Sequence, residues 1–156
     1  MSDMPHPSNP VVELIDEVIR VGGRLISIFE SVNAATGLSP MEATVLTAVV
    51  ESHFAPTVPQ IGRSLGHPRQ VIQRAANALM SAGLIERAPN PHHKLAPLLM
   101  PTRKGRTLKH KADERATEVT AALLRRIGTR KCRRIARDVR ELRGEIEAHL
   151  RPGEIP

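Results

Sequence analysis

The sequence predicts a mainly α-helical protein that carries one small β-hairpin. Three observations support this fold class: apolar residues recur at helical spacing along most of the chain, helix-start signals follow short breaks, and two strand-like runs flank the stretch PNPHHK. A chain of 156 residues is long enough to form a domain with its own apolar core. The sequence contains no internal repeat.

The charge of the chain is positive and unevenly placed. The formal net charge is +7; residues 1–101 contain 7 Lys/Arg and 8 Asp/Glu, whereas residues 102–151 contain 16 and 7. A basic excess favours a polyanionic partner. Because Trp and Tyr are absent and Phe occurs only at Phe29 and Phe54, binding of single strands or RNA by stacking on aromatic side chains is disfavoured. Duplex DNA is therefore the favoured partner.

The sequence shows no targeting signal. No run approaches the roughly 18 apolar residues of a membrane span, and the N-terminal MSDMPHPSNP lacks the basic start and apolar stretch of a secretory signal. The single cysteine, Cys132, excludes an internal disulfide and suits a reducing compartment. We therefore expect a cytoplasmic protein in which residues 1–9 form a disordered lead-in.

The first predicted helix begins after Pro10 and ends near Gly37. Its apolar residues follow one another at spacings of three, four and seven, starting with Val12, Ile15 and Ile19. This spacing places them in one stripe along the helix, so the helix is expected to bury that side.

Strong start signals predict two further helices. Ser39 is a favourable N-cap, Pro40 fits the first helical position, and Glu42 completes a capping box. After the break FAPT, Thr57 can cap a short helix that runs to Leu65.

The next helix, residues 69–81, has two chemically different sides. The tight turn Gly66-His67-Pro68 precedes it, and Gly83 ends it as a left-handed cap. One narrow sector is polar and contains Gln70, Gln73, Arg74 and Asn77. The opposite side is apolar and contains Ile72, Ala75, Ala76 and Leu79.

Two strands and two helices complete the chain. LIERA and LAPLLM predict the strands, and Pro97 fits only an edge or irregular strand. A long helix is expected from Thr102 to about Ile127; Gly128 then breaks it, and Thr129 can cap a last helix to about Leu150. That last helix has a coiled-coil-like seam, formed by Ile135, Val139, Leu142 and Ile146.

A short helix, a three-residue turn, a second helix and a hairpin are the order of a winged helix-turn-helix. In that motif the second helix enters the major groove, where Gln and Asn can pair with adenine and Arg with guanine. The polar sector of residues 69–81 has this chemistry. Taken alone the sector is more simply an ordinary solvated face, but the turn before it and the hairpin after it favour DNA recognition.

Three stretches resemble the MarR family of transcription regulators: GLSPMEATVL, LGHPRQVIQRAANALMSAGLIER and PNPHHKLAPLLMPTRKG. The resemblance covers about residues 10–150. It implies a homodimer in which residues 10–37 and 106–150 form a helical dimerisation region and residues 38–105 form the DNA-binding winged region. It also implies a pseudo-palindromic operator and repression that a small-molecule effector relieves.

The resemblance and the polar sector together assign candidate site residues. The DNA-binding candidates are Pro68, Arg69, Gln70, Gln73, Arg74, Asn77, Arg87, His92, His93 and Lys94. The dimerisation candidates are Val12, Ile15, Ile19, Ile135, Val139, Leu142 and Ile146. The effector-pocket candidates are Phe29, His53 and Phe54. The wing departs from the family pattern, since it reads His92-His93-Lys94-Leu95 where relatives carry an Asp beside paired arginines.

Other chemistries find less support in the sequence. His92 and His93 point apart on a strand and have no Cys or carboxylate within the tip, so we expect neither a metal site nor a cofactor. Cys132 has four flanking cations that favour its thiolate, but a half-buried structural thiol is the simpler interpretation. The basic run over residues 125–143 is either a solvated, partly paired face or a second nucleic-acid contact. No nucleophile elbow, phosphate loop or carboxylate pair indicates an enzyme.

The favoured function is therefore a sequence-specific, DNA-binding transcriptional regulator, expected to act as a homodimeric repressor. Two alternatives stay open at this point. One is a protein-interaction module that keeps the fold without specific DNA binding, which the weakly charged wing motivates. The other is a thiol- or metal-responsive sensor that still binds DNA.

Overall fold

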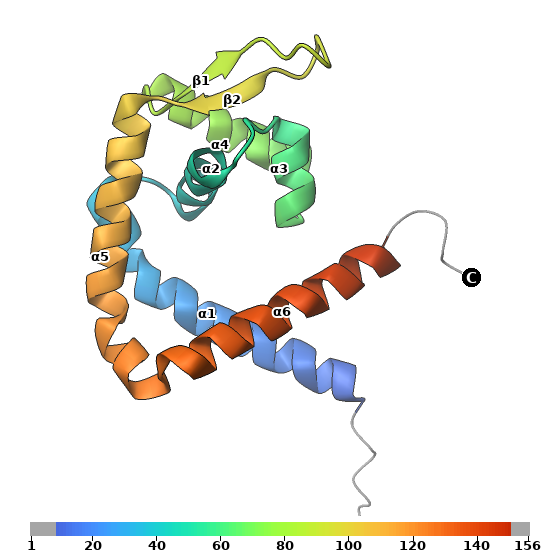
Figure 1. Cartoon of the computed structure of the whole chain (residues 1–156), viewed down its shortest axis with the longest axis vertical. Coiled ribbons are helices and arrows are strands. Elements are labelled where there is room, and N and C mark those ends of the chain that lie inside the picture. Colours follow the sequence, from blue (N-terminus) through green and yellow to red (C-terminus); the bar gives the residue numbers. More distant parts are fainter. Residues whose placement is uncertain (1–8, 151–156) are drawn as a thin grey trace, which may run out of the picture. The chain divides into compact units, whose positions relative to one another are not determined.

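The computed structural model describes residues 9–150, in which six helices and two strands are found (Figure 1). The elements are α1 (Pro10–Thr36), α2 (Pro40–Glu51), α3 (Val58–Leu65), α4 (Arg69–Ser81), β1 (Ile85–Ala88), β2 (Leu98–Pro101), α5 (Arg103–Ile127) and α6 (Thr129–His149). The predicted fold class, mainly α with a small hairpin wing, is confirmed. The chain divides into two compact units, Met1–Thr117 and Glu118–Pro156, and α5 runs through the boundary between them.

Local hydrogen bonds explain why the helices begin where they do. Ser39 and Glu42 form the predicted capping box: the Ser39 N–H donates to Glu42 Oε2 at 3.0 Å and the Glu42 N–H to Ser39 Oγ at 3.4 Å. Thr57 and Gln60 form a second box at the start of α3. Asn9, at the edge of the lead-in expected to be disordered, accepts from the Val11 N–H and caps α1. Residues 1–8 and 151–156 lie outside the described residues.

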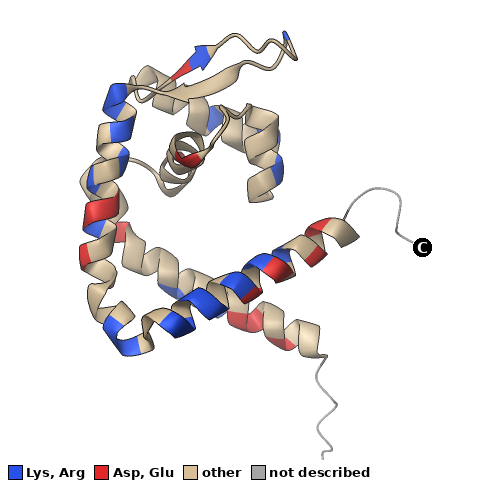
Figure 2. Cartoon of the chain, in the orientation of Figure 1, with Lys and Arg blue, Asp and Glu red and all other residues tan. Residues whose placement is uncertain are grey.

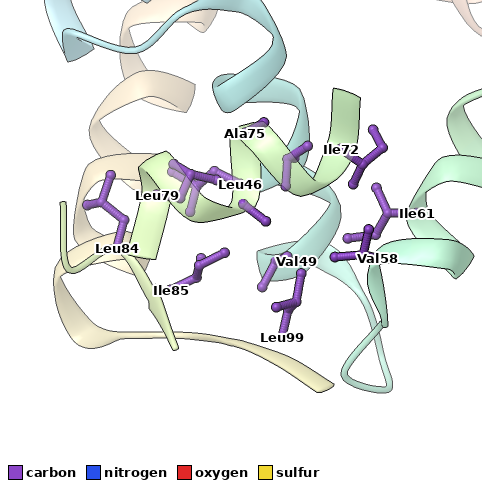
Figure 3. Packing of buried hydrophobic residues seen from close by; sticks show 12 residues of the cluster. Leu46, Val49, Val58, Ile61, Ile72, Ala75, Leu79, Leu84, Ile85 and Leu99 are labelled. Atoms are coloured by element: carbon purple, nitrogen blue, oxygen red, sulfur yellow. The ribbon is translucent and has the colours of Figure 1, made fainter. Parts of the chain in front are cut away.

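A closed apolar core holds the winged part together (Figure 3). Side chains from α2, α3, α4 and the hairpin point toward one another; the largest that are fully buried are Leu46, Ile72, Leu79, Leu99 and Val45. The predicted apolar side of α4 is the side that enters this core. At about 25 cal/mol per Å² of apolar surface removed from water, such burial is the main stabilising contribution to this unit.

The hairpin is antiparallel and is fastened at both ends. Its register pairs Ile85 with Pro101 and Ala88 with Leu98. The Leu99 N–H donates to the Pro56 carbonyl at 2.8 Å, which ties β2 to the segment before α3.

At the other end of the hairpin, Gly105 packs on the Leu84 carbonyl so closely that a Cβ atom would overlap it. Only glycine fits at this position, since no side chain can be accommodated there.

Two local predictions were wrong. The second strand begins at Leu98 rather than Leu95, because the Ala96 backbone bonds within the loop: its N–H donates to the His93 carbonyl and its carbonyl accepts from Asn90 Nδ2.

The second concerns α6, which Thr129 does not cap. The N-cap is Gly128, with φ of 87°, and it provides no side-chain hydrogen bond. A positive φ favours glycine at this position, so the N-cap lies one residue earlier than predicted and α6 begins at Thr129.

The two terminal helices differ from the winged part in their burial. Val32 is the one buried residue of α1, and α6 has none among the residues that are described. Ile19 is 67% exposed and Ile146 is 50% exposed. Within residues 9–150, the apolar stripes predicted for these helices are therefore largely exposed.

Within residues 9–150, no helix is both long enough and apolar enough to cross a membrane. The same residues contain no cluster of three or more His, Cys, Asp or Glu side chains that would suit a metal ion.

Candidate nucleic-acid interface

Helix α4 presents a polar side opposite the core. Gln70, Arg74 and Asn77 are exposed and Gln73 is partly exposed. The helix follows a turn in which Gly66 has φ of 66° and the His67 N–H donates to the Gly62 carbonyl at 3.0 Å. The apolar side of α4 is buried in the core, and this burial determines which side chains of the helix face outward. The exposed polar sector is therefore a consequence of core packing.

A hydrogen-bonded chain links this polar side to the hairpin. Gln73 Nε2 donates to Asn77 Oδ1 at 3.0 Å, and a terminal nitrogen of Arg87 on β1 reaches the same oxygen at 3.5 Å. The Asn77 carbonyl is therefore occupied on both sides. The Asn77 amide NH₂ and the Gln73 carbonyl remain available to a base edge, so each residue offers a single group rather than a bidentate pair.

The N-terminus of α4 is open to a phosphate. Its N-cap is Pro68, and no side chain bonds the backbone N–H groups of its first turn. Unpaired N–H groups at a helix start, together with the helix dipole, attract anions. The exposed Arg69 lies at the same end and adds a permanent positive charge.

Asn90 shapes the tip of the wing. Its Nδ2 donates to the Ala96 carbonyl at 2.7 Å, and its Oδ1 accepts from the His92 N–H at 3.0 Å. One side chain thus closes the loop that carries His92, His93 and Lys94, all of which are exposed. The sequence analysis missed Asn90, although Asn between two prolines is a turn signal.

A groove of about 900 Å³ runs between α3 and the wing tip. Arg63 and Arg69 line it, as do His92 and His93. Arg63 was also missed, because one arginine on an eight-residue helix produces no periodic pattern. Phe54, an effector-pocket candidate, is 90% exposed and lines this groove.

Cations are dense at the start of α5 and along α6 (Figure 2). At the start of α5, Lys104 Nζ donates to the Ala82 carbonyl at the end of α4, at 2.7 Å. Within α6, Arg143 Nε lies 3.5 Å from Glu147 Oε1. Cys132, in the same basic run, is half-buried. The positive charge is thus spread well beyond α4.

A smaller cleft of about 110 Å³ lies between α1, α2 and α5. Phe29 and Val32 line it from α1, Leu46 from α2 and Leu108 from α5. Of the three effector-pocket candidates, Phe29 lines this cleft. His53 is exposed and, like Phe54, is not among the residues that line it.

Lys109 lies at the edge of the cleft and is 8% exposed. Its Nζ donates to Glu51 Oε1 at 2.8 Å and to the two carboxylate oxygens of Asp113 at 2.6 and 2.7 Å. Burial alone lowers the pKa of Lys109, but the hydrogen bonds and charges of Asp113 and Glu51 outweigh it and raise the pKa above 10.5. The Lys109 ammonium is therefore charged at neutral pH.

Comparisons with known proteins agree with this geometry. A model of the MarR family matches residues 36–94, which span α2, α3, α4 and the wing tip. The uncharacterized protein Rv2011c of Mycobacterium tuberculosis is 38% identical over 116 residues, which cover 74% of this chain and 80% of that protein.

Solved structures share the fold over nearly the whole chain. A MarR-family regulator from Rhodococcus sp. RHA1 has a TM-score of 0.71 at 19% identity and covers 90% of this chain and 96% of its own. CouR from Rhodococcus jostii RHA1, solved with p-coumaroyl-CoA bound, has a TM-score of 0.68 at 20% identity, with coverage of 98% and 100%. BldR from Sulfolobus solfataricus has a TM-score of 0.76 at 14% identity, with coverage of 90% and 99%.

The matched segment is the winged helix-turn-helix, and the similar structures are those of transcription regulators rather than enzymes. In this chain, the matched segment contains α2, α3, the two-sided helix α4 and the first strand of the antiparallel hairpin. The chain therefore belongs to the MarR family of transcription regulators.

Proposed function

We propose that the protein is a homodimeric repressor that binds a pseudo-palindromic operator and is released by a small molecule. The observation that carries this proposal is the polar side of α4, held outward by a closed core and flanked by the Arg63–Arg69 groove and the wing. Base contacts from the major groove supply sequence specificity, while contacts to phosphates supply general affinity.

The geometry suggests a role for each part of the surface. Arg74 is exposed in the middle of α4 and suits a bidentate contact to guanine. Gln73 and Asn77 each offer one group to a base, and Arg87 orients Asn77. The N-terminus of α4 at Pro68, with Arg69 and Gln70, meets a phosphate. His92, His93 and Lys94 lie at the tip that would approach the minor groove.

The dimer is supported by the uncovered apolar stripes of α1 and α6. We assign residues 10–37 and 106–150 to a dimerisation region and residues 38–105 to the DNA-binding region. Isolated apolar residues on a surface are ordinary, but a continuous stripe over several turns indicates a protein interface. The stripe residues are Val12, Ile15 and Ile19 on α1 and Ile135, Val139, Leu142 and Ile146 on α6.

The effector is assigned to the cleft between α1, α2 and α5, which includes Phe29. This cleft joins a helix of the proposed dimerisation region to the winged core. A ligand that fits one spacing of these helices better than another would shift the distance between the two recognition helices, and DNA affinity would change with it.

A gel-shift titration with DNA from upstream of the protein's own coding region tests the proposal. Arg74→Ala should weaken operator binding by about 10- to 100-fold, the range for one bidentate base contact, and should weaken binding to random DNA far less. Arg137→Ala is the matched control, because it removes the same charge from α6. Equal losses for the two variants would show that only general charge matters. If the wild-type protein binds neither operator nor random DNA, the alternative of a protein-interaction module is favoured.

A further inference from the structure

The polar edge of the α1–α2–α5 cleft has a charge that constrains what can bind there. Among the described residues that line the cleft, Lys109 and Asp113 are the charged ones, and Glu51 is the second partner of Lys109. One ammonium and two carboxylates give this ion triad, Glu51–Lys109–Asp113, a formal charge of −1. The rest of the lining is mostly apolar, with Asn33, Thr36 and Thr47 as neutral polar members.

The Lys109 ammonium has no donor left for an incoming anion. It has three N–H groups, and three hydrogen bonds to Glu51 and Asp113 account for them. A ligand carboxylate could reach Lys109 only by displacing one of these carboxylates, which would then lose its partner. Asp113, in contrast, is only partly used. Each of its oxygens accepts one bond from Lys109, and its side chain is 57% exposed, so it can accept a further donor.

The volume of the cleft restricts the size of the ligand. An apolar cavity of about 150 Å³ holds one benzene molecule. The 110 Å³ cleft, which is partly open, therefore suits one ring or a short branched chain and not a large acyl-CoA such as the ligand of CouR.

We propose that this cleft binds a small, mainly apolar molecule that is neutral or positively charged, with its donor group on Asp113, and that the ion triad rejects carboxylates. This inference deepens the proposed function, since it gives the effector of that site a chemical class. It opposes what the whole chain would favour, because the net charge of +7 attracts anions to the surface in general.

Three probes with one ring but different charge test the inference: benzylamine, benzyl alcohol and benzoate. Each is titrated into the full-length protein, and binding is followed by protein NMR at fixed pH and salt. Benzylamine should bind about two- to fivefold more tightly than benzyl alcohol, the effect of a partly exposed ion pair. Benzoate should bind most weakly of the three.

Variants locate the effect. Asp113→Asn should remove the advantage of benzylamine over benzyl alcohol and should weaken benzyl alcohol less, because the Asn carbonyl can still accept a hydrogen bond from its hydroxyl. Ala112→Phe fills the cleft from α5 and should abolish binding of all three probes. If this variant does not fold, Ala43→Phe fills the cleft from α2 and should have the same effect. Benzoate as the tightest ligand, or an advantage of benzylamine that survives Asp113→Asn, would overturn the inference. Binding of none of the probes by the wild type would overturn it too. Operator binding, measured separately by gel shift, reports on the proposed function independently.

Discussion

The winged part and the two terminal helices use apolar residues in opposite ways. In α2–α4 and the hairpin, Leu46, Ile72, Leu79 and Leu99 are 2% exposed or less. In α1 and α6, Ile19 and Ile146 are at least half exposed although their spacing is as regular. The winged part thus completes its own core, whereas α1 and α6 have apolar stripes without a cover in the described chain. Under the proposed function, the surface that binds DNA is built within one chain, and its spacing on DNA is set by the association of two chains.

The largest expected effect tests the uncovered stripe. Ile146→Glu puts a charge into each copy of the proposed interface. Because burying such a side chain contributes about 1.5–3 kcal/mol and two copies change, the dimer dissociation constant should rise at least about a hundredfold. Sedimentation over a dilution series measures this. Arg137→Glu, on the opposite side of α6, should leave the constant unchanged. A wild type that is monomeric when dilute and still binds a full operator tightly would contradict the dimer.

The next effect compares the two kinds of apolar residue directly. Leu79→Ala removes a buried side chain from the winged core and should lower the free energy of unfolding by about 2–5 kcal/mol. Ile135→Ala removes as large an exposed side chain from α6 and should cost less than about 0.5 kcal/mol in dilute, monomeric protein. Urea denaturation followed by circular dichroism measures both. Similar losses would show that the single chain covers α6 after all.

A smaller effect tests whether the recognition surface is organised before DNA binds. If Arg87 acts by holding Asn77, removing either residue should weaken operator binding, and removing both should cost less than the sum. The coupling energy expected for such a hydrogen bond is about 0.5–1.5 kcal/mol. Gel-shift affinities of Arg87→Ala, Asn77→Ala and the double variant give this value. Strict additivity would mean that Arg87 contacts DNA on its own.

The smallest effect concerns Lys109, whose ion triad joins α2 to α5. Since the folded state raises the pKa of Lys109 above its ordinary value of 10.5, its ionic stabilisation is complete below that pH and is lost as the pH rises through the folded pKa. Relative to Lys109→Met, the wild type should therefore lose stability above pH 10.5 and not near neutrality. We expect less than about 1 kcal/mol, because Glu51 and Asp113 are more than half exposed. Thermal unfolding at several pH values shows the difference; parallel curves would contradict it.

Much of the fold could be predicted because its signals are local. The capping box at Ser39, the cap at Thr57 and the left-handed glycine at Gly83 act within a few residues of themselves, and all were found where the sequence places them. The two-sided pattern of α4 could also be predicted from the sequence, since the 3.6-residue periodicity is a property of the helix itself. The candidate DNA-binding residues on α4 follow from that pattern, those of the wing follow from the family resemblance, and their contacts with DNA remain predictions.

The interactions that only the tertiary structure decided join residues far apart in the chain. Gly105 must lack a side chain because the Leu84 carbonyl lies against it, and Asn77 is fixed by Arg87 on a different element. In the sequence, Lys109 does not differ from the other lysines of a basic helix. Only the fold places it against Glu51, which lies 58 residues earlier in the chain. Sequence periodicity determined which residues share a face, because that depends on backbone geometry alone. Packing between elements decides which faces are buried and which charges are paired. No local sequence pattern encodes that packing.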